Sequence, residues 1–235
     1  MMLLVVLTLL VALIGLFVGN LLNFVIARQL VSFARVRRLA RAEGALGWVP
    51  IAGSMRRSEW VGLAVELLAA LMAVALFLRY GLSLRTLVLF AASLVLLDTA
   101  AIDFKIRMID TLVMVVAMFA VLLLAPLTGV GWLRSVLGLL MAGIFFSFLF
   151  GLARVLFRGV AAPFGLGDVY LGAFIGALVG FVALPAALFY GIAMAGLVAL
   201  VLILLRAVGR KVPQYIAYGT FLCLGALLFL ATGRL

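Results

Sequence analysis

The most informative absence in this chain of 235 residues is histidine, which does not occur at all. Its absence excludes hydrolysis by a serine–histidine or cysteine–histidine pair, and it excludes metal sites that need imidazole ligands. Cysteine occurs once, as Cys223 within an apolar segment, so an intrachain disulfide and a multi-cysteine zinc site are excluded as well. Any acid–base chemistry must therefore use Asp, Glu, Tyr, Lys or the lone cysteine.

Acidic residues and long polar stretches are also scarce. Seven Asp and Glu stand against 18 Lys and Arg, giving a net charge of +11, while 69% of the residues are hydrophobic and the mean hydropathy is +1.47. A soluble domain cannot bury that much apolar surface, so we expect an all-α, polytopic integral membrane protein. Membrane topology explains the basic residues better than nucleic-acid binding, which we do not expect.

Apolar runs of about 20 residues predict roughly eight transmembrane helices in a single membrane domain, 1–235. The first run has no basic leader segment and no small-residue cleavage site, so we expect a retained span. The polar stretch 27–59 is expected to be a basic cytoplasmic loop between the first two spans. The predicted helices are 3–26, 60–78, 85–103, 110–126, 132–156, 167–183, 185–206 and 215–232.

The distribution of Lys and Arg predicts the orientation, because cytoplasmic segments of membrane proteins are enriched in basic residues. With both termini on the outer side, most basic residues fall in cytoplasmic segments, and the outer side keeps only Arg79, Arg85, Arg134 and Arg234. Asp103 then ends the third predicted span and Asp168 begins the sixth. The two carboxylates are expected at the same cytoplasmic edge, on different helices.

Each of these acids also has a purely structural alternative. Gly165-Leu166-Gly167-Asp168 can form a tight turn that aims the carboxylate inward, or Asp168 can simply cap the helix that follows. Asp103 precedes Lys105 and Arg107, which is also the pattern of an interfacial charge cluster. The glycines that follow at four-residue spacing predict a close-packing helix face; they are Gly172, Gly176 and Gly180.

Two further acids lie near Asp103. Asp98 is five residues earlier, which places it about 140° around a regular helix, so it needs a partner of its own. Asp110 or Thr111 is expected to cap the next helix.

The two edge acids are more informative together than alone. Carboxyl groups that converge from separate helices can share one proton. The ionised group can then take a proton from water while the protonated group polarises a peptide carbonyl. This is aspartyl hydrolysis, which needs no histidine, metal or cofactor.

At this point the chain resembles the type IV prepilin leader peptidases, the bacterial branch of the Gly-x-Gly-Asp membrane aspartyl proteases. The run 165–169 resembles the second catalytic motif, with Tyr170 in place of the usual Lys. The run 102–105 resembles the first motif, although its sequel at 109–111 lacks the usual proline. The segment 15–28 is similar to the opening span of the family, and 65–68 is similar to a Val-Glu-Leu of its second span. The segment 216–221 is similar to a closing Ile-Pro-Phe-Gly-Pro-Phe, whose two prolines are replaced here.

The resemblance implies that Asp103 and Asp168 are the catalytic pair and that Gly165 and Gly167 support the second motif. It implies cleavage of the leader from type IV prepilins or type II secretion pseudopilins, at the cytoplasmic face of a bacterial inner membrane. No cofactor is needed for that reaction.

Zinc and methyl transfer are separate questions. Many relatives carry two Cys-x-x-Cys pairs in the loop after the first span, and many methylate the new N-terminus with S-adenosylmethionine. The loop here has no cysteine, so we expect no zinc and leave the methyltransferase activity open. Glu66 is a candidate methyl-transfer residue or a structural partner of Arg56 or Arg57.

Two other functions stay open. The acids could relay protons or bind cations in a transporter, although they gather near one face instead of the midplane. The replaced prolines also allow an inactive scaffold for pilus assembly. Besides the prepilin, the only other expected partner is membrane lipid, and the oligomeric state is left open.

Overall fold

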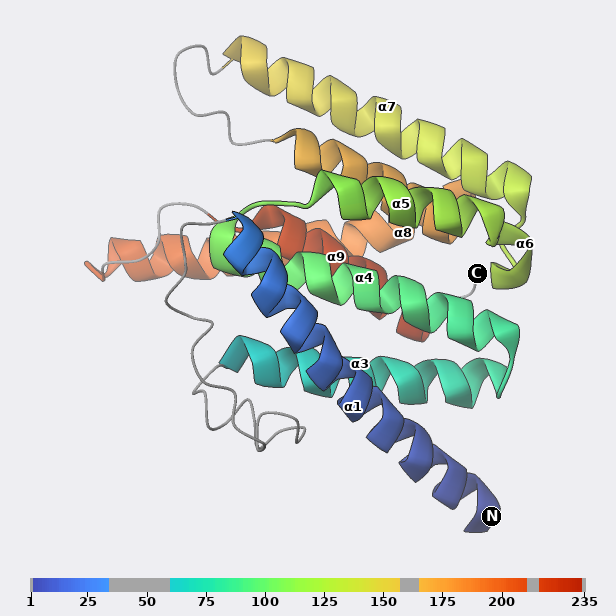
Figure 1. Ribbon diagram of the computed structural model, residues 1–235. Helices are drawn as coiled ribbons and strands as arrows, with labels where there is room; N and C mark the ends of the chain where they lie inside the picture. The colour runs from blue at the N-terminus through green and yellow to red at the C-terminus, as the bar shows by residue number, and fades with distance from the viewer. Residues whose placement is uncertain (1, 34–59, 157–164, 211–215, 234–235) are drawn as a thin grey trace.

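In the computed structural model, which describes residues 2–33, 60–156, 165–210 and 216–233, the only regular secondary structure is helix (Figure 1). Five helices are long and apolar enough to cross a membrane, and α5 and α9 are shorter apolar helices. These are the features of a multi-pass membrane protein. The helices are α1 (Met2–Phe33), α3 (Trp60–Tyr80), α4 (Leu84–Ile106), α5 (Thr111–Leu123), α6 (Ala125–Thr128), α7 (Trp132–Leu156), α8 (Leu166–Ala207) and α9 (Tyr218–Thr232).

Most helix boundaries lie near the predicted ones, and the exceptions have physical causes. The first helix continues past 26 to Phe33, because Ile26 and Leu30 lie one turn apart and both are buried in a small cluster with residues of α4. The predicted helix 110–126 is wrong at its end: α5 stops at Leu123, and Pro126 lies in the first turn of α6, where its missing N–H is tolerated. Asp110 caps α5 as expected, accepting from the N–H groups of Leu112 and Val113 at 2.9 and 3.3 Å.

The two predicted helices 167–183 and 185–206 form one element, α8, with a break at Gly180 instead of residue 184. Gly180 has φ 76° and ψ 164°, a conformation that essentially only glycine adopts. Pro185 follows within the first turns of the second arm, where it interrupts little helical hydrogen bonding. We call 166–179 the first arm of α8 and 181–207 the second arm.

The chain reverses direction between these two arms. The start of the first arm lies near the start of α9, since the side chain of Ile109 reaches the Cβ positions of both Gly167 and Gly219. In the second arm, Gly191 packs against Leu222, again near the start of α9. Figure 1 shows the first arm running alongside α7 and the second arm returning beside α9.

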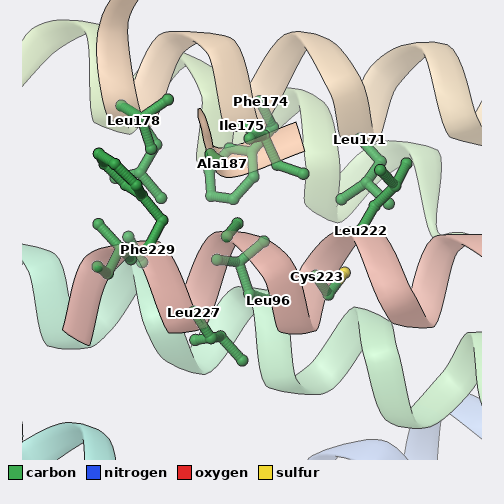
Figure 2. Packing of buried hydrophobic residues seen from close by; sticks show 14 of the residues in the cluster. Leu96, Leu171, Phe174, Ile175, Leu178, Ala187, Leu222, Cys223, Leu227 and Phe229 are labelled. Atoms are coloured by element: carbon green, nitrogen blue, oxygen red, sulfur yellow. The ribbon is translucent and has the colours of Figure 1, made fainter. Parts of the chain in front are cut away.

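Both arms and α9 share one core with α4. Figure 2 shows Leu171 beside Leu222 and Leu178 beside Phe229, so the first arm lies along the full length of α9. Leu96 of α4 and Cys223 of α9 are fully buried in the same cluster. Because lipid tails are as apolar as these side chains, the helices associate through close packing. Because α8, α4 and α3 all pack against the shorter helix α9, it occupies the centre of the bundle.

The glycine face of the first arm serves packing, as predicted. Gly176 and Gly138 of α7 meet so closely that a Cβ on either would overlap the backbone of the other, and Gly172 makes room for the ring of Phe146. These contacts let α7 and the first arm approach along their length.

The helix ends divide into two groups. In Figure 1 the ends of α1, α4 and α7 lie on the left with the beginnings of α3, α5, α8 and α9, and with the end of the second arm. We call this the basic end, because six of the described Lys and Arg belong to it: Arg28, Lys105, Arg107, Arg154, Arg206 and Arg210. The opposite end has Arg79, Arg85 and Arg134.

An apolar cleft of ≈ 260 Å³ opens between α4 and α5, with Phe174 of the first arm in its wall. Its lining comes from the first half of α4, between Leu87 and Val95, and from the second half of α5, between Ala117 and Leu124. The cleft therefore lies toward the end opposite Asp103 and is separate from the site described next.

Candidate active site

Asp103 lies in the last turn of α4 and is only 6% exposed. The helix ends just beyond it, because Arg107 adopts the left-handed conformation and donates its N–H to the Asp103 carbonyl at 2.8 Å. The carboxylate faces α9, where Oδ2 accepts from the Thr220 N–H at 2.6 Å and lies 2.9 Å from the Thr220 hydroxyl. Burial makes a negative charge on Asp103 costly, and these donors and Arg107 offset part of that cost.

Asp168 lies in the first turn of α8 and is partly buried. Its Oδ2 accepts from the N–H of Gly165 at 2.9 Å, and its own N–H donates to the Gly165 carbonyl at 3.2 Å. This reciprocal arrangement is the one expected of an acid that caps the first turn of a helix, so Asp168 does have the capping role that the sequence allowed. It does not exclude a chemical role, because the carboxylate keeps Oδ1 for other partners.

The structure brings the two predicted site acids together. Asp103 and Asp168 lie close enough to interact electrostatically, although they come from different helices and are 65 positions apart. Ile109, in the segment between α4 and α5, lies between the beginnings of α8 and α9. Its Cβ is 2.8 Å from the position that a Cβ on Gly167 would occupy, and its Cδ1 is 3.3 Å from the position that a Cβ on Gly219 would occupy. We call Asp103 and Asp168 the edge pair.

Gly167 and Gly219 allow these close approaches, whereas Gly165 does not need to be glycine. A Cβ on Gly219 would lie 3.0 Å from Asp103 Oδ2, and a Cβ on Gly167 would collide with Ile109. A Cβ on Gly165 would lie 3.7 Å from Asp168 Oδ2, which is an ordinary contact, and its φ of −102° is open to any residue. Of the two glycines predicted to support the motif, only Gly167 is sterically required.

Glu66 and Asp98 lie apart from the edge pair, at the contacts of α1. The Asn23 side-chain amide donates to Glu66 Oε1 and to the Gly62 carbonyl, both at 3.0 Å, and Glu66 is completely buried. Gln29, with its amide nitrogen turned toward α4, lies 3.1 and 3.2 Å from the carboxylate oxygens of Asp98. We call Glu66 and Asp98 the α1 pair.

These contacts answer two points raised by the sequence. Asp98 was expected to face away from Asp103 and to need its own partner, and that partner is Gln29. Arg56 and Arg57, the expected partners of Glu66, lie outside the described residues, as does the predicted basic loop 27–59 from residue 34 onward. In the described ranges, no three Cys, Asp or Glu side chains gather as metal ligands would.

Sequence reasoning did not single out Thr220 or Ile109. Gly219 and Thr220 lie in the segment 216–221, whose pattern attracted notice, but nothing local in that segment points to Asp103, which is 117 positions away. Ile109 lies in the segment 109–111, which was noted as the sequel of the first motif, but nothing in that segment indicates that its side chain separates the starts of α8 and α9. Only the assembled fold identifies these two side chains as neighbours of the edge pair.

Comparison with family models, with curated protein sequences and with solved structures finds no match.

Proposed function

We propose that the protein is a membrane aspartyl endopeptidase that removes the leader peptide of type IV prepilins or pseudopilins at the cytoplasmic face of a bacterial inner membrane. The observation that carries the proposal is that Asp103 and Asp168 lie at the same end of the helix bundle, where Ile109 lies against the starts of α8 and α9 that hold the two carboxylates. Both acids also lie in the two segments that resemble the catalytic motifs of that family.

The reaction follows from two carboxyl groups that share one proton. The ionised group takes a proton from water as the water oxygen attacks the scissile carbonyl carbon, and the protonated group gives its proton to the carbonyl oxygen. In the second step the carbon–nitrogen bond breaks as the acid that is now protonated gives its proton to the leaving nitrogen. A hydroxyl of the tetrahedral intermediate gives its proton to the ionised acid as the carbonyl re-forms, so the pair again holds one proton. No metal or cofactor takes part in this sequence.

The proposed topology has eight crossings with both termini on the outer side. Two observations support it: the two arms of α8 run in opposite directions, and the described basic residues concentrate at the basic end. Basic residues favour the cytoplasmic side, so the edge pair would lie at the cytoplasmic edge. A prepilin presents its leader there, just before its hydrophobic helix, and water can reach this depth.

The proposal leaves open whether the protein also methylates the new N-terminus, and it includes no zinc site. Glu66 has a structural explanation in its bond to Asn23, which joins α3 to α1. S-adenosylmethionine would be used only if the protein also methylates the new N-terminus.

A proton- or cation-coupled transporter is the main alternative. The acids available to it at the membrane interior are the α1 pair, yet each of these carboxylates already bonds an amide of α1 and so serves helix association. An inactive scaffold for pilus assembly would not require two costly carboxylates to converge.

The proposal is tested with the full chain in proteoliposomes, a prepilin that retains its leader, and S-adenosylmethionine. Mass spectrometry measures leader loss for the wild type, Asp103→Asn and Asp168→Asn. We expect cleavage by the wild type and a loss of about 10²–10⁴-fold in each variant. A further mass increase of one CH₂ on the product would reveal methylation.

Asp110→Asn is the matched control, because it neutralises another acid at the same end while keeping a side-chain oxygen for the helix cap. Asp103→Glu separates a peptidase from a proton relay, since the added methylene misplaces the carboxyl group and a relay tolerates this better. A folded wild type that leaves several prepilins intact would reject the peptidase in favour of the scaffold.

A further inference from the structure

Thr220 is the third residue of α9, a position where the backbone N–H has no partner within its own helix. Here that N–H donates to Asp103 Oδ2 at 2.6 Å. A carboxylate of α4 therefore satisfies a free donor at the beginning of α9. The contact fixes the oxygen Oδ2 and also places negative charge where the helix dipole favours it.

The Thr220 side chain adds a second contact to the same carboxylate. Its Oγ1 lies 2.9 Å from Asp103 Oδ2 and 3.2 Å from the carbonyl oxygen of Ala100. The hydroxyl has a single hydrogen, and the Ala100 carbonyl can only accept. The direction of the hydrogen bonds therefore depends on whether Asp103 carries a proton.

Both protonation states of Asp103 can be fully satisfied. When Asp103 is ionised, the Thr220 O–H donates to Oδ2. When Asp103 is protonated on Oδ2, its O–H donates to Oγ1, and the Thr220 O–H turns to the Ala100 carbonyl. A group that changes protonation during catalysis needs such a partner, because buried polar hydrogens without acceptors are costly.

We propose that Thr220 is a positioning residue of the peptidase reaction, whose N–H and hydroxyl hold Asp103 Oδ2 in the ionised and the protonated state alike. This inference rests on the proposed function and goes beyond it. Both Thr220 and Asp103 are buried, with exposed fractions of 7% and 6%, so water has little room to replace the hydroxyl. Within the described part of the chain, Oδ1 has no hydrogen bond and is the oxygen left for water or substrate.

The arrangement depends on the residue type found here. In the motif that the segment 216–221 resembles, the corresponding residue is proline, which has neither an N–H nor a hydroxyl. A Cβ on Gly219 would press on Asp103 Oδ2, so the glycine before Thr220 is what lets α9 approach the carboxylate.

The test compares Thr220→Val, which keeps the N–H and the shape but loses the hydroxyl, with Thr220→Ser, which keeps both donors. Full-length proteins in proteoliposomes cleave a prepilin at a series of concentrations, which separates kcat from KM. We expect Thr220→Val to lower kcat by about 10- to 100-fold with KM unchanged, and Thr220→Ser to restore it. Thr99→Val is the matched control: Thr99 is a buried threonine of α4, and among the described residues its hydroxyl bonds only its own helix, at 2.9 Å.

The outcomes are distinguishable. An active wild type with equal kcat in Thr220→Val would overturn the positioning role and leave the peptidase intact, and so would a Thr220→Ser variant as slow as Thr220→Val. An inactive wild type would overturn the proposed function, and the role of Thr220 with it. If Thr220→Val does not fold, Thr220→Ala removes the same hydroxyl with less bulk, and the same comparison with Thr220→Ser decides.

Discussion

The edge pair and the α1 pair are acids in apolar helices, buried except for the partly buried Asp168, but they are held by different donors. Glu66 and Asp98 accept from side-chain amides on α1. Asp103 and Asp168 accept from backbone N–H groups at the beginnings of α9 and α8. In the first arrangement the donor is a side chain of a neighbouring helix, and in the second it is a backbone group at the beginning of a helix.

This difference separates structural acids from chemical ones. A side-chain amide gives a carboxylate a fixed partner on the neighbouring helix. Backbone donors at helix starts hold the two carboxylates at one end of the bundle, where Ile109 lies against the starts of α8 and α9. The contrast predicts that the two pairs respond differently to the same substitutions.

The largest expected contrast is in activity. Asn or Gln in place of the α1 pair, in Asp98→Asn and Glu66→Gln, keeps a hydrogen-bonding group of the same shape, so leader cleavage should stay close to wild type. The same change in the edge pair should lower cleavage by about 10²–10⁴-fold. Cleavage rates of the four variants, measured side by side, check this; equal losses in both pairs would remove the distinction.

A smaller effect is expected at the glycines beside Asp168. Gly167→Ala places a Cβ against Ile109 and displaces the start of α8, so cleavage should fall by about 10- to 100-fold. Gly165→Ala meets only an ordinary contact and serves as the control, with cleavage near wild type. Equal sensitivity at both positions would contradict the role assigned to Ile109 as a spacer.

Substitutions at the contacts of the α1 pair should instead lower the stability of the folded protein. Asn23→Ala removes a donor to Glu66 and to the Gly62 carbonyl, so two buried hydrogen bonds are lost, which costs about 1–3 kcal/mol. Thermal unfolding in detergent measures the loss. Replacing both partners, in Asn23→Leu with Glu66→Leu, should recover much of it, and a double variant less stable than Asn23→Ala would argue against this account.

Gln29→Leu should have the smallest effect. Gln29 is only partly buried and bonds Asp98 near the end of α1, so we expect a loss of about 0.5–1.5 kcal/mol. The same unfolding measurement checks it, with leader cleavage unchanged. A loss of cleavage in folded Gln29→Leu would show that the contact between Gln29 and Asp98 affects the activity of the edge pair.

Much of the fold follows from apolar run lengths. The predicted helix 132–156 coincides with α7, and the 100° rotation per residue placed Asp98 on a different face from Asp103. The errors occur where one residue changes local hydrogen bonding: Pro126 ends α5 early, and Gly180, not the residues near Pro185, carries the reversal. Run length alone does not reveal a break inside a continuous apolar stretch.

The candidate site was only partly predictable. Asp103 and Asp168 could be paired because topology limits which helix ends share an edge. Thr220 and Ile109 could not, since their contacts depend on how α9 and the segment before α5 pack against α4. Such contacts join residues far apart in the chain and leave no periodic pattern.

The reversal at Gly180 also constrains how the chain enters the membrane during synthesis. The 42 residues of α8 form an apolar stretch with no charged residue between Asp168 and Arg206. The turn at Gly180 therefore has no basic residue near it in the sequence that could determine on which side of the membrane it lies. Basic residues flank the stretch on both sides, with Arg154 and Arg158 before it and Arg206 and Arg210 after it. If both flanks are retained on the same side, the stretch must cross an even number of times. The two arms then insert together as a hairpin, and a glycine takes the place of a translocated loop.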